Sequence, residues 1–315
     1  MNGRGLNVTV GMIRNGSGES SFCPTGSHNW TISIEIQRDS AGGLPIWLLK
    51  RKDETSYYRY KRGRLHLMDI KKVLVESDNG IPSNEAFYKA WEGFRKRQYP
   101  CELFQAHQLE DDSLCLSRET LVAGGLRTVE AAMAKIGMQI PEANNLPSQL
   151  RAYRGRETWT STWGQLRQKY GETGPPKPLF VKPLNRNKGF PSIALFNADD
   201  FVSLSHLSDS DAVLVAEYVL FESEWRCFVC RGQVIEISHY QGELFTYPDA
   251  NVIRSAIEDF GDDAPAGYAI DFGVLDNGRT VLVEVNPGYS LGSYGLNAVE
   301  YSELLEARWV ELATQ

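Results

Sequence analysis

The chain has 315 residues, with 40 acidic residues against 33 Lys and Arg and a formal net charge of −7. At about 100–200 residues per domain, this length predicts two domains or one elaborate domain. The 42% hydrophobic and 23% charged fractions exclude a disordered chain or a coiled coil. The acidic balance argues against nucleic acid as a general partner, and no apolar run reaches the ~18–20 residues of a membrane span. Because the opening residues carry no apolar signal segment, we expect a cytoplasmic protein.

The five cysteines are odd in number and scattered, so they do not predict a disulfide framework. Cys227 and Cys230 form a C-x-x-C pattern inside a predicted strand. Residues i and i+3 of a strand point to opposite faces, and no second pair exists to complete a zinc site. We therefore interpret both as ordinary strand cysteines. The five histidines are equally dispersed, which argues against a histidine-based mechanism.

The N-terminal part begins with residues 1–28, rich in Gly, Ser and Asn, which predict a flexible tail. Strands are expected over residues 31–36 and 45–49. The run over residues 50–64 mixes cations with three tyrosines. Such a run is typical either of single-stranded nucleic-acid binding or of an exposed edge hairpin whose cations prevent aggregation. The edge hairpin is the favoured interpretation.

Helices are predicted over residues 83–97 and 128–137 from their apolar spacing and, for the second, a terminal glycine. Residues 171–178, with three prolines and two glycines, form a linker. The chain then becomes rich in strands, with short helices expected over 199–205 and 298–313. The expected strands cover residues 179–182, 193–196, 211–219, 225–230, 233–238, 268–274 and 280–285.

The last two of these strands form a hairpin that carries the most informative polar side chains. Glu284 and Asn286 are two residues apart and share one face of their strand. The turn between the strands places Asp271 opposite them, and three oxygen donors at a strand end suit Mg²⁺. The alternative is solvated acids at a hairpin end. Asp271 argues against that alternative, because it interrupts an apolar strand where an unpartnered carboxylate is costly.

Lys182 lies near the end of a short strand beside a polar, Gly-ended loop that includes Lys188. A lysine facing a cleft is a natural phosphate ligand, although a solvated strand-end lysine is an equal alternative. The backbone after Glu217 could hold adenine, and Glu224 could accept ribose hydroxyls. Arg226, on the following strand, could meet a phosphate or carboxylate with two parallel hydrogen bonds.

In this order, the segments 180–183, 224–229 and 283–295 resemble the ATP-grasp superfamily, most closely one of its little-characterised branches. The resemblance covers about residues 120–300, and the Glu-x-Asn hairpin end is its most specific part. It implies an α+β chain with an ATP-grasp fold, in which two α+β subdomains clasp ATP, preceded by a smaller α/β N-terminal domain. The boundaries implied are a tail (1–28), the N-terminal domain (29–120), a helical connector (121–178), the small subdomain (179–219) and the large subdomain (220–315).

The resemblance also implies roles for individual residues. Lys182 would hold the α- or β-phosphate, and Arg226 would stabilise the γ-phosphate or an acylphosphate oxygen. One or two Mg²⁺, or Mn²⁺ in their place, would be held by Asp271, Glu284 and Asn286. The usual second phosphate lysine has no clean equivalent, so Arg154 or Arg156 could replace it unless both are simply solvated. The remaining ATP-binding residues implied are Glu217, Tyr218, Val219, Glu224 and Lys188.

The activity implied is ATP-dependent ligation of a carboxylate to an amine through an acylphosphate, with release of ADP and phosphate. The Gly-rich loop over residues 287–295 is the expected substrate loop, unless it is only a connection into the last helix; its substrate-binding members would be Tyr289, Ser290, Ser293 and Tyr294. The substrates would be small-molecule or peptide carboxylates and amines. A kinase-like phosphotransferase and an ATP-regulated RNA- or protein-binding module are the alternatives. The oligomeric state stays open, with a homodimer among the options.

Overall fold

The computed structural model describes residues 68–111, 113–142, 144–184 and 190–315, together with the backbone of three earlier strands. The chain divides into two compact units, Met1–Leu65 and His66–Gln315. In the first unit, β1 (Ser20–Ser21), β2 (Ser33–Gln37) and β3 (Ile46–Lys50) form an antiparallel sheet in that order. This confirms the two strands expected there. The rest of the expected tail and the basic run beyond Lys50 lie outside the described residues.

The second unit opens with a parallel sheet in which β4 (Lys72–Asp78) lies between β6 (Cys101–Phe104) and β7 (Thr120–Ala123). A short β5 (Ile81–Pro82) turns back antiparallel along β4. The helices of this part are α1 (Glu85–Lys96), α2 (His107–Glu110) and α3 (Leu126–Lys135). The expected border between residues 120 and 121 falls inside β7, because that buried strand completes the sheet by pairing with β4.

A second, antiparallel sheet has the order β10-β9-β11-β8 and carries two helices. The expected strands appear here as β9 (Leu179–Pro183), β10 (Ile193–Leu195) and β11 (Ala212–Glu217), and the expected short helix as α5 (Ala198–Ser203). Two further elements, β8 (Thr158–Thr162) and α4 (Trp163–Tyr170), were expected to belong to the connector. They join this sheet because β8 pairs with β11 along its whole length, so this part begins before residue 179.

The third sheet has the order β13-β12-β14-β15 and is antiparallel throughout. Its strands are β12 (Phe221–Cys230), β13 (Gln233–Gly242), β14 (Gly267–Leu275) and β15 (Thr280–Asn286). All nine residues of β14 are buried, because apolar side chains cover both faces of the strand. One face packs against α6 (Ala250–Phe260) and the 3₁₀ segment η1 (Ser148–Tyr153). A second 3₁₀ turn, η2 (Gly261–Asp263), follows α6.

The two cysteines of β12 follow the geometry expected of strand residues. Cys227 packs in the core beneath α6, whereas the Cys230 Sγ lies 4.0 Å from the Glu303 carbonyl oxygen on the C-terminal helix. Both thiols are buried, and burial raises the pKa of each. The interpretation of both as ordinary strand cysteines is therefore confirmed.

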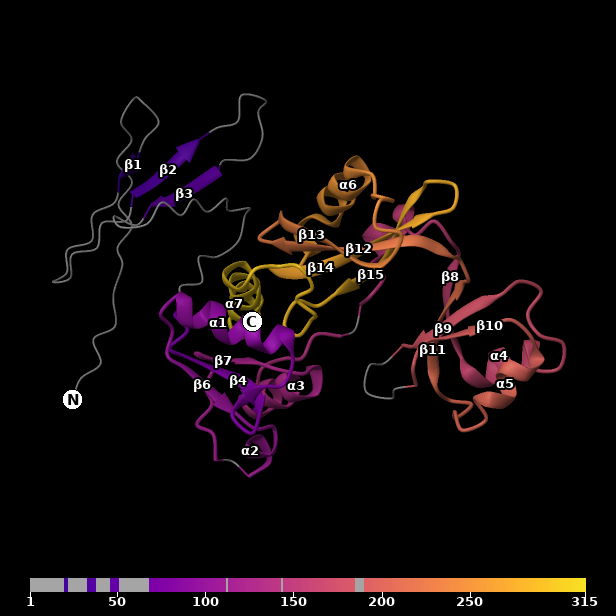
Figure 1. Ribbon diagram of the computed structural model, residues 1–315, viewed down its shortest axis with the longest axis horizontal. Helices are drawn as coiled ribbons and strands as arrows, with labels where there is room; N and C mark the ends of the chain where they lie inside the picture. Colours follow the sequence, from indigo (N-terminus) through magenta and orange to yellow (C-terminus); the bar gives the residue numbers. More distant parts are fainter. Residues whose placement is uncertain are drawn as a thin grey trace. The chain divides into compact units, whose positions relative to one another are not determined.

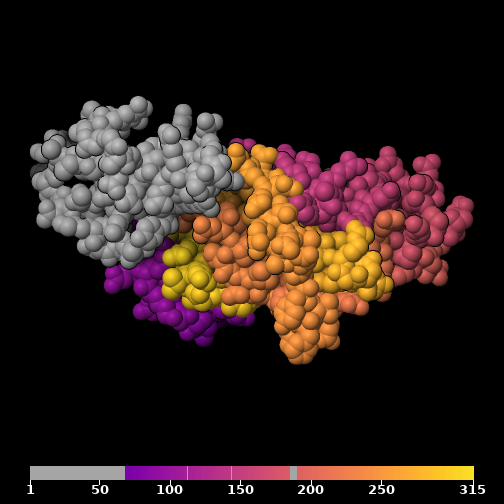
Figure 2. Space-filling model, turned by 90° about the horizontal axis from the view of Figure 1, so that it is seen from above, coloured from indigo at the N-terminus to yellow at the C-terminus, as the bar shows by residue number. Residues whose placement is uncertain are grey.

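The C-terminal helix α7 (Ala298–Ala313) joins the parallel sheet and the third sheet into one core. Figure 1 shows α1 and α7 side by side, and Figure 2 shows residues near the C-terminus, in yellow, between the purple residues that begin the second unit and the orange β12–β13 region. Close approach is possible because Gly93 of α1 faces the backbone of Ala298. In the part of the chain that the structure describes, no helix has both the length and the apolar character needed to cross a bilayer.

We expect Gly93→Ala to lower the free energy of unfolding by about 1–3 kcal/mol, the usual range for overpacking. A Cβ at this position would overlap the carbonyl of Ala298 and force α1 away from α7. Urea unfolding measures the change. Glu92→Ala, on the exposed side of the same helix, is the control and should stay within about 0.5 kcal/mol of the parent. Equal stability of the Gly93→Ala protein would contradict the close contact.

Candidate active site

The hairpin β14–β15 brings together the three predicted oxygen donors, here called the hairpin cluster: Asp271, Glu284 and Asn286. The strand register places Asp271 directly opposite Glu284. The Asn286 amide donates from Nδ2 to Asp271 Oδ2 at 3.2 Å and to Glu284 Oε1 at 3.3 Å. The three side chains therefore converge on one point at the open end of the hairpin.

Arg226 reaches the hairpin cluster from β12, where it lies opposite Asp271. Its Nε and Nη2 donate to the two Asp271 carboxylate oxygens at 2.8 and 2.6 Å, a bidentate pair. Burial raises the pKa of Asp271 to about 6, and the two hydrogen bonds from Arg226 oppose that rise. Burial acts to lower the pKa of Arg226, but the carboxylate outweighs it and the pKa is raised. At neutral pH, both members of the pair are charged.

Lys182 reaches the same cluster from β9, a strand of a different sheet. Its Nζ lies 3.1 Å from Glu284 Oε2, and both side chains are largely buried. Burial acts to raise the pKa of Glu284, but the charge and hydrogen bond of Lys182 outweigh it, so the pKa is lowered. A cation and a group of acids from two sheets thus meet at one place, as the sequence predicts.

An aromatic wall lies beside Arg226 and consists of Tyr240 and Tyr294. The two rings are 5.3 Å apart, and the Arg226 guanidinium lies 4.8 Å from the Tyr294 ring centre, within cation–π distance. The Tyr240 hydroxyl donates to Glu224 Oε2 at 2.8 Å, and burial raises its pKa. Tyr294 is 43% exposed, so this wall is open to a ligand on one side.

The predicted adenine segment lies at the end of β11. Glu217 accepts from the Glu157 amide at 3.2 Å and lies 3.6 Å from Lys177 Nζ. The Tyr218 ring packs edge-on against Phe196 at 5.1 Å. Val219 follows them outside the strand and is half-buried. These residues belong to the second sheet, on the same side of the cluster as Lys182.

The two candidate replacements for a second phosphate lysine differ in what they contact. Arg154 donates to the carbonyl oxygens of Leu146 and Pro147 and to the Thr158 hydroxyl. Arg156 instead donates to two carbonyls of β15, those of residues 282 and 283, immediately before Glu284. Arg156 is therefore the nearer of the two to the hairpin cluster. Lys188 lies outside the described residues.

The expected substrate loop is held against the parallel sheet by two of its four named side chains. The buried Tyr289 donates to Glu130 Oε1 at 2.9 Å, and Ser290 donates to the Gly124 carbonyl at 2.8 Å. Burial leaves the Tyr289 ring no open face, which differs from its expected contact with substrate. Ser293 is also buried, so Tyr294 is the most exposed of the four.

Sequence reasoning missed two residues that contact the candidate site. Tyr240 was overlooked because the predicted strand ended at residue 238, whereas β13 continues to Gly242. Asn145 comes from a polar connection without periodicity, and its Nδ2 lies 3.5 Å from Glu284 Oε2. The backbone of Asn145 also accepts from the Val285 amide at 2.8 Å, a contact that no local sequence signal indicates.

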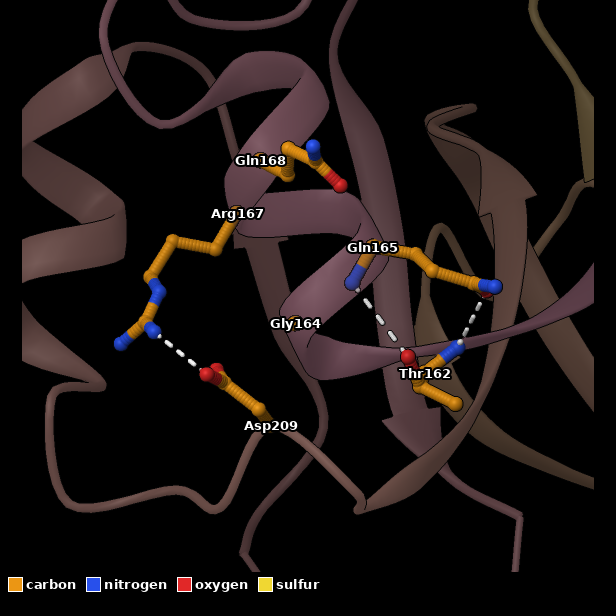
Figure 3. A pocket seen from close by; sticks show the side chains of 6 residues that line it. All are labelled: Thr162, Gly164, Gln165, Arg167, Gln168 and Asp209. Atoms are coloured by element: carbon orange, nitrogen blue, oxygen red, sulfur yellow. Dashed lines mark hydrogen bonds and ion pairs between the residues drawn. The ribbon is translucent and has the colours of Figure 1, made fainter.

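A separate surface hollow of about 480 Å³ lies on the second sheet's side of the molecule (Figure 3). It is lined by the polar start of α4 and by the Arg167–Asp209 ion pair, whose atoms are 2.7 Å apart. None of the predicted site residues lines it. The hollow is therefore not the candidate active site.

The donor set of the hairpin cluster fits a hard dication. Mg²⁺ is typically bound through one or two carboxylates, with phosphate oxygens and water in its other positions. Two carboxylates and an amide oxygen meet that requirement. No group of three His, Cys, Asp or Glu residues capable of holding a metal occurs within the described ranges, so the amide of Asn286 is needed as the third donor.

The antiparallel sheets and this site define the class of the protein. The chain belongs to the ATP-grasp superfamily, and its α+β fold is the ATP-grasp fold. Within the superfamily, residues 153–304 match the model of an ATP-grasp domain family, the second family of its clade. That range contains the whole hairpin cluster together with Lys182 and Arg226.

Several solved structures share the architecture at low sequence identity. A RimK domain ATP-grasp protein from Sphaerobacter thermophilus is 16% identical, with a TM-score of 0.49 over 78% of this chain and 100% of that chain. D-alanine–D-alanine ligase from Bacillus anthracis, complexed with ATP, is 16% identical, with a TM-score of 0.48 over 77% and 96%. The macrocyclase MdnC from Microcystis aeruginosa, bound to a precursor peptide, is 14% identical, with a TM-score of 0.42 over 78% and 100%. Likeness at this level does not establish a function, and no curated protein matches the chain.

We expect magnesium-dependent nucleotide binding to release protons below about pH 6. A dication requires ionised Asp271, whose pKa burial raises to about 6, so protons compete with metal as the pH falls. From pH 7.5 to 5.5, the ionised fraction of such a group, and with it the affinity, falls about fourfold. Calorimetry in buffers of different ionisation enthalpy counts the protons, after subtraction of those that ATP itself releases to Mg²⁺.

Asp276→Asn, in the exposed turn of the same hairpin, is the control and should leave the pH dependence unchanged. Binding at pH 5.5 without release of protons from the protein would show that Asp271 is not displaced.

Proposed function

We propose that this protein is an ATP-dependent ligase that joins a carboxylate to an amine through an acylphosphate and releases ADP and phosphate. The observation that carries the proposal is the meeting of Lys182 with the hairpin cluster inside an ATP-grasp domain. A lysine from one sheet and acids from another can hold a triphosphate between them. Each side supplies the charge that its part of metal-bound ATP requires.

In this proposal, the hairpin cluster holds one or two Mg²⁺, or Mn²⁺ in their place. The metal supplies neutralisation of charge on the phosphates. Lys182 exchanges its ion pair with Glu284 for the α- or β-phosphate, and Arg226 keeps Asp271 ionised while facing the terminal phosphate. Backbone at residues 217–219 binds adenine, and Glu224 binds ribose after release from the Tyr240 hydroxyl.

The chemistry requires no nucleophile from the protein. It requires positioning, electrostatic stabilisation and the exclusion of water, because an acylphosphate hydrolyses in water. The exposed aromatic wall of Tyr240 and Tyr294 next to Arg226 supports a substrate position on that side. We propose small-molecule or peptide carboxylates and amines as substrates, with Tyr294 as the contact residue of the loop.

The decisive experiment incubates the full chain with Mg·ATP and pools of amino acids and short peptides, and follows nucleotide and product by mass spectrometry. A ligase releases ADP and phosphate and forms an amide, with loss of one water from the joined substrates. A stable phosphorylated product would instead identify a phosphotransferase. Absence of Mg·ATP binding by calorimetry would contradict both activities.

We expect Lys182→Met to lower the turnover of ATP by about 10²-fold or more, because a phosphate charge loses its counter-charge in a water-poor site. The side chain keeps its length, so packing against β11 is retained. Steady-state release of ADP measures the effect. The control is Lys169→Met on the exposed side of α4, which should retain full turnover. Unchanged activity of the Lys182→Met protein would remove Lys182 from the site.

A further inference from the structure

Arg308, on the buried helix α7, contacts the chain immediately after the hairpin cluster. Its Nε donates to the Pro287 carbonyl at 2.9 Å, one residue beyond Asn286. Its Nη1 donates to Glu311 Oε2 at 2.5 Å, and its side chain is only 7% exposed. One fixed guanidinium plane therefore links the end of β15 to a carboxylate one helical turn further along α7.

Glu311 extends this link to the other strand of the hairpin. The same Oε2 accepts the amide of Ala266 at 2.9 Å, directly before β14 begins. Ala266 and Pro287 are the two ends of the hairpin that carries Asp271, Glu284 and Asn286. The Arg308–Glu311 pair thus joins both ends of the hairpin to one face of α7.

The backbones at this point have no room to shift. A Cβ on Gly288 would overlap the Gly267 carbonyl, and a Cβ on Gly267 would overlap the Leu304 carbonyl of α7. Gly288 has φ +78°, a conformation that other residues rarely adopt. Seven residues before Arg308, on the same helix face, the Tyr301 hydroxyl donates to the Leu291 carbonyl at 2.6 Å. The loop therefore follows α7 at two fixed points.

We infer that Arg308 is a positioning residue for the metal ligands, acting through Pro287 on Asn286 and, through Glu311, on the start of β14. The inference rests on the proposed function, because it assigns Arg308 to the metal side of the nucleotide site. Residues that orient metal ligands without touching the metal typically change metal affinity by 10–100-fold when removed. Lys182 and the adenine segment lie on the second sheet and do not depend on this link.

The test separates metal-dependent from metal-independent binding in the full chain. Calorimetry measures the affinity for ADP with EDTA and with saturating Mg²⁺ in the parent and in Arg308→Ala. We expect the variant to keep the affinity for metal-free ADP within about twofold and to lose at least tenfold of the gain that Mg²⁺ provides. Arg308→Lys keeps the charge without the planar fork and should show an intermediate loss.

Two further measurements distinguish positioning from general destabilisation. Added guanidinium at low millimolar concentration should restore the magnesium gain in Arg308→Ala. Arg97→Ala, which removes a different arginine paired with α7 through Glu306, should lower the thermal midpoint while leaving the gain intact. If Arg308→Ala retains the gain, or loses metal-free binding equally, the inference is wrong; if Arg308→Ala does not fold, the same criteria apply to Arg308→Lys. A parent protein without any magnesium gain would overturn the proposed function instead.

Discussion

The buried ion pair between Arg226 and Asp271 is the interaction on which the candidate site depends. Asp271 lies in a strand that is buried throughout, where an unpaired carboxylate would be neutral or destabilising. Two short hydrogen bonds from the neighbouring strand keep it charged and fix the register of β12 against β14. That register places Glu284 and Asn286 beside it and leaves Arg226 facing the aromatic wall. Removing one partner would leave a buried charge, so the pair acts as a unit.

The site is assembled by elements that do not themselves carry the chemistry. Helix α7 contacts the parallel sheet on one side and the third sheet on the other, and it holds the loop that follows Asn286. Tyr289 and Ser290, which we expected to contact substrate, tie this loop to the parallel sheet. Anchoring at both sides gives the loop a defined position, and Tyr294 remains the exposed member that can meet a ligand. The aromatic wall and Arg226 then form the part of the site where a substrate could differ between related enzymes.

The sequence predicted the two hairpins of the third sheet well, because each is a local structure. A tight turn with glycine between apolar runs sets the pairing, and side chains two residues apart must share a face. It did not predict β8 or the three strands of the parallel sheet. Strand β8 is rich in Thr, Ser and Trp and only half-buried, and the parallel strands pair across long connections that leave no local pattern. The bounds of the two larger parts shifted for the same reason.

Local patterns therefore established the superfamily resemblance, the candidate metal ligands and Lys182, since these depend on residue type and short spacing. Contacts between distant segments decided the rest. They include the ion pair of Lys182 with Glu284, the choice of Arg156 over Arg154 as the nearer arginine, the presence of Tyr240 and Asn145, and the hold of Arg308 on Pro287. Each joins residues brought close only when sheets and helices pack. Packing energy depends on the whole core, and no spacing along the chain encodes which side chains will finally meet.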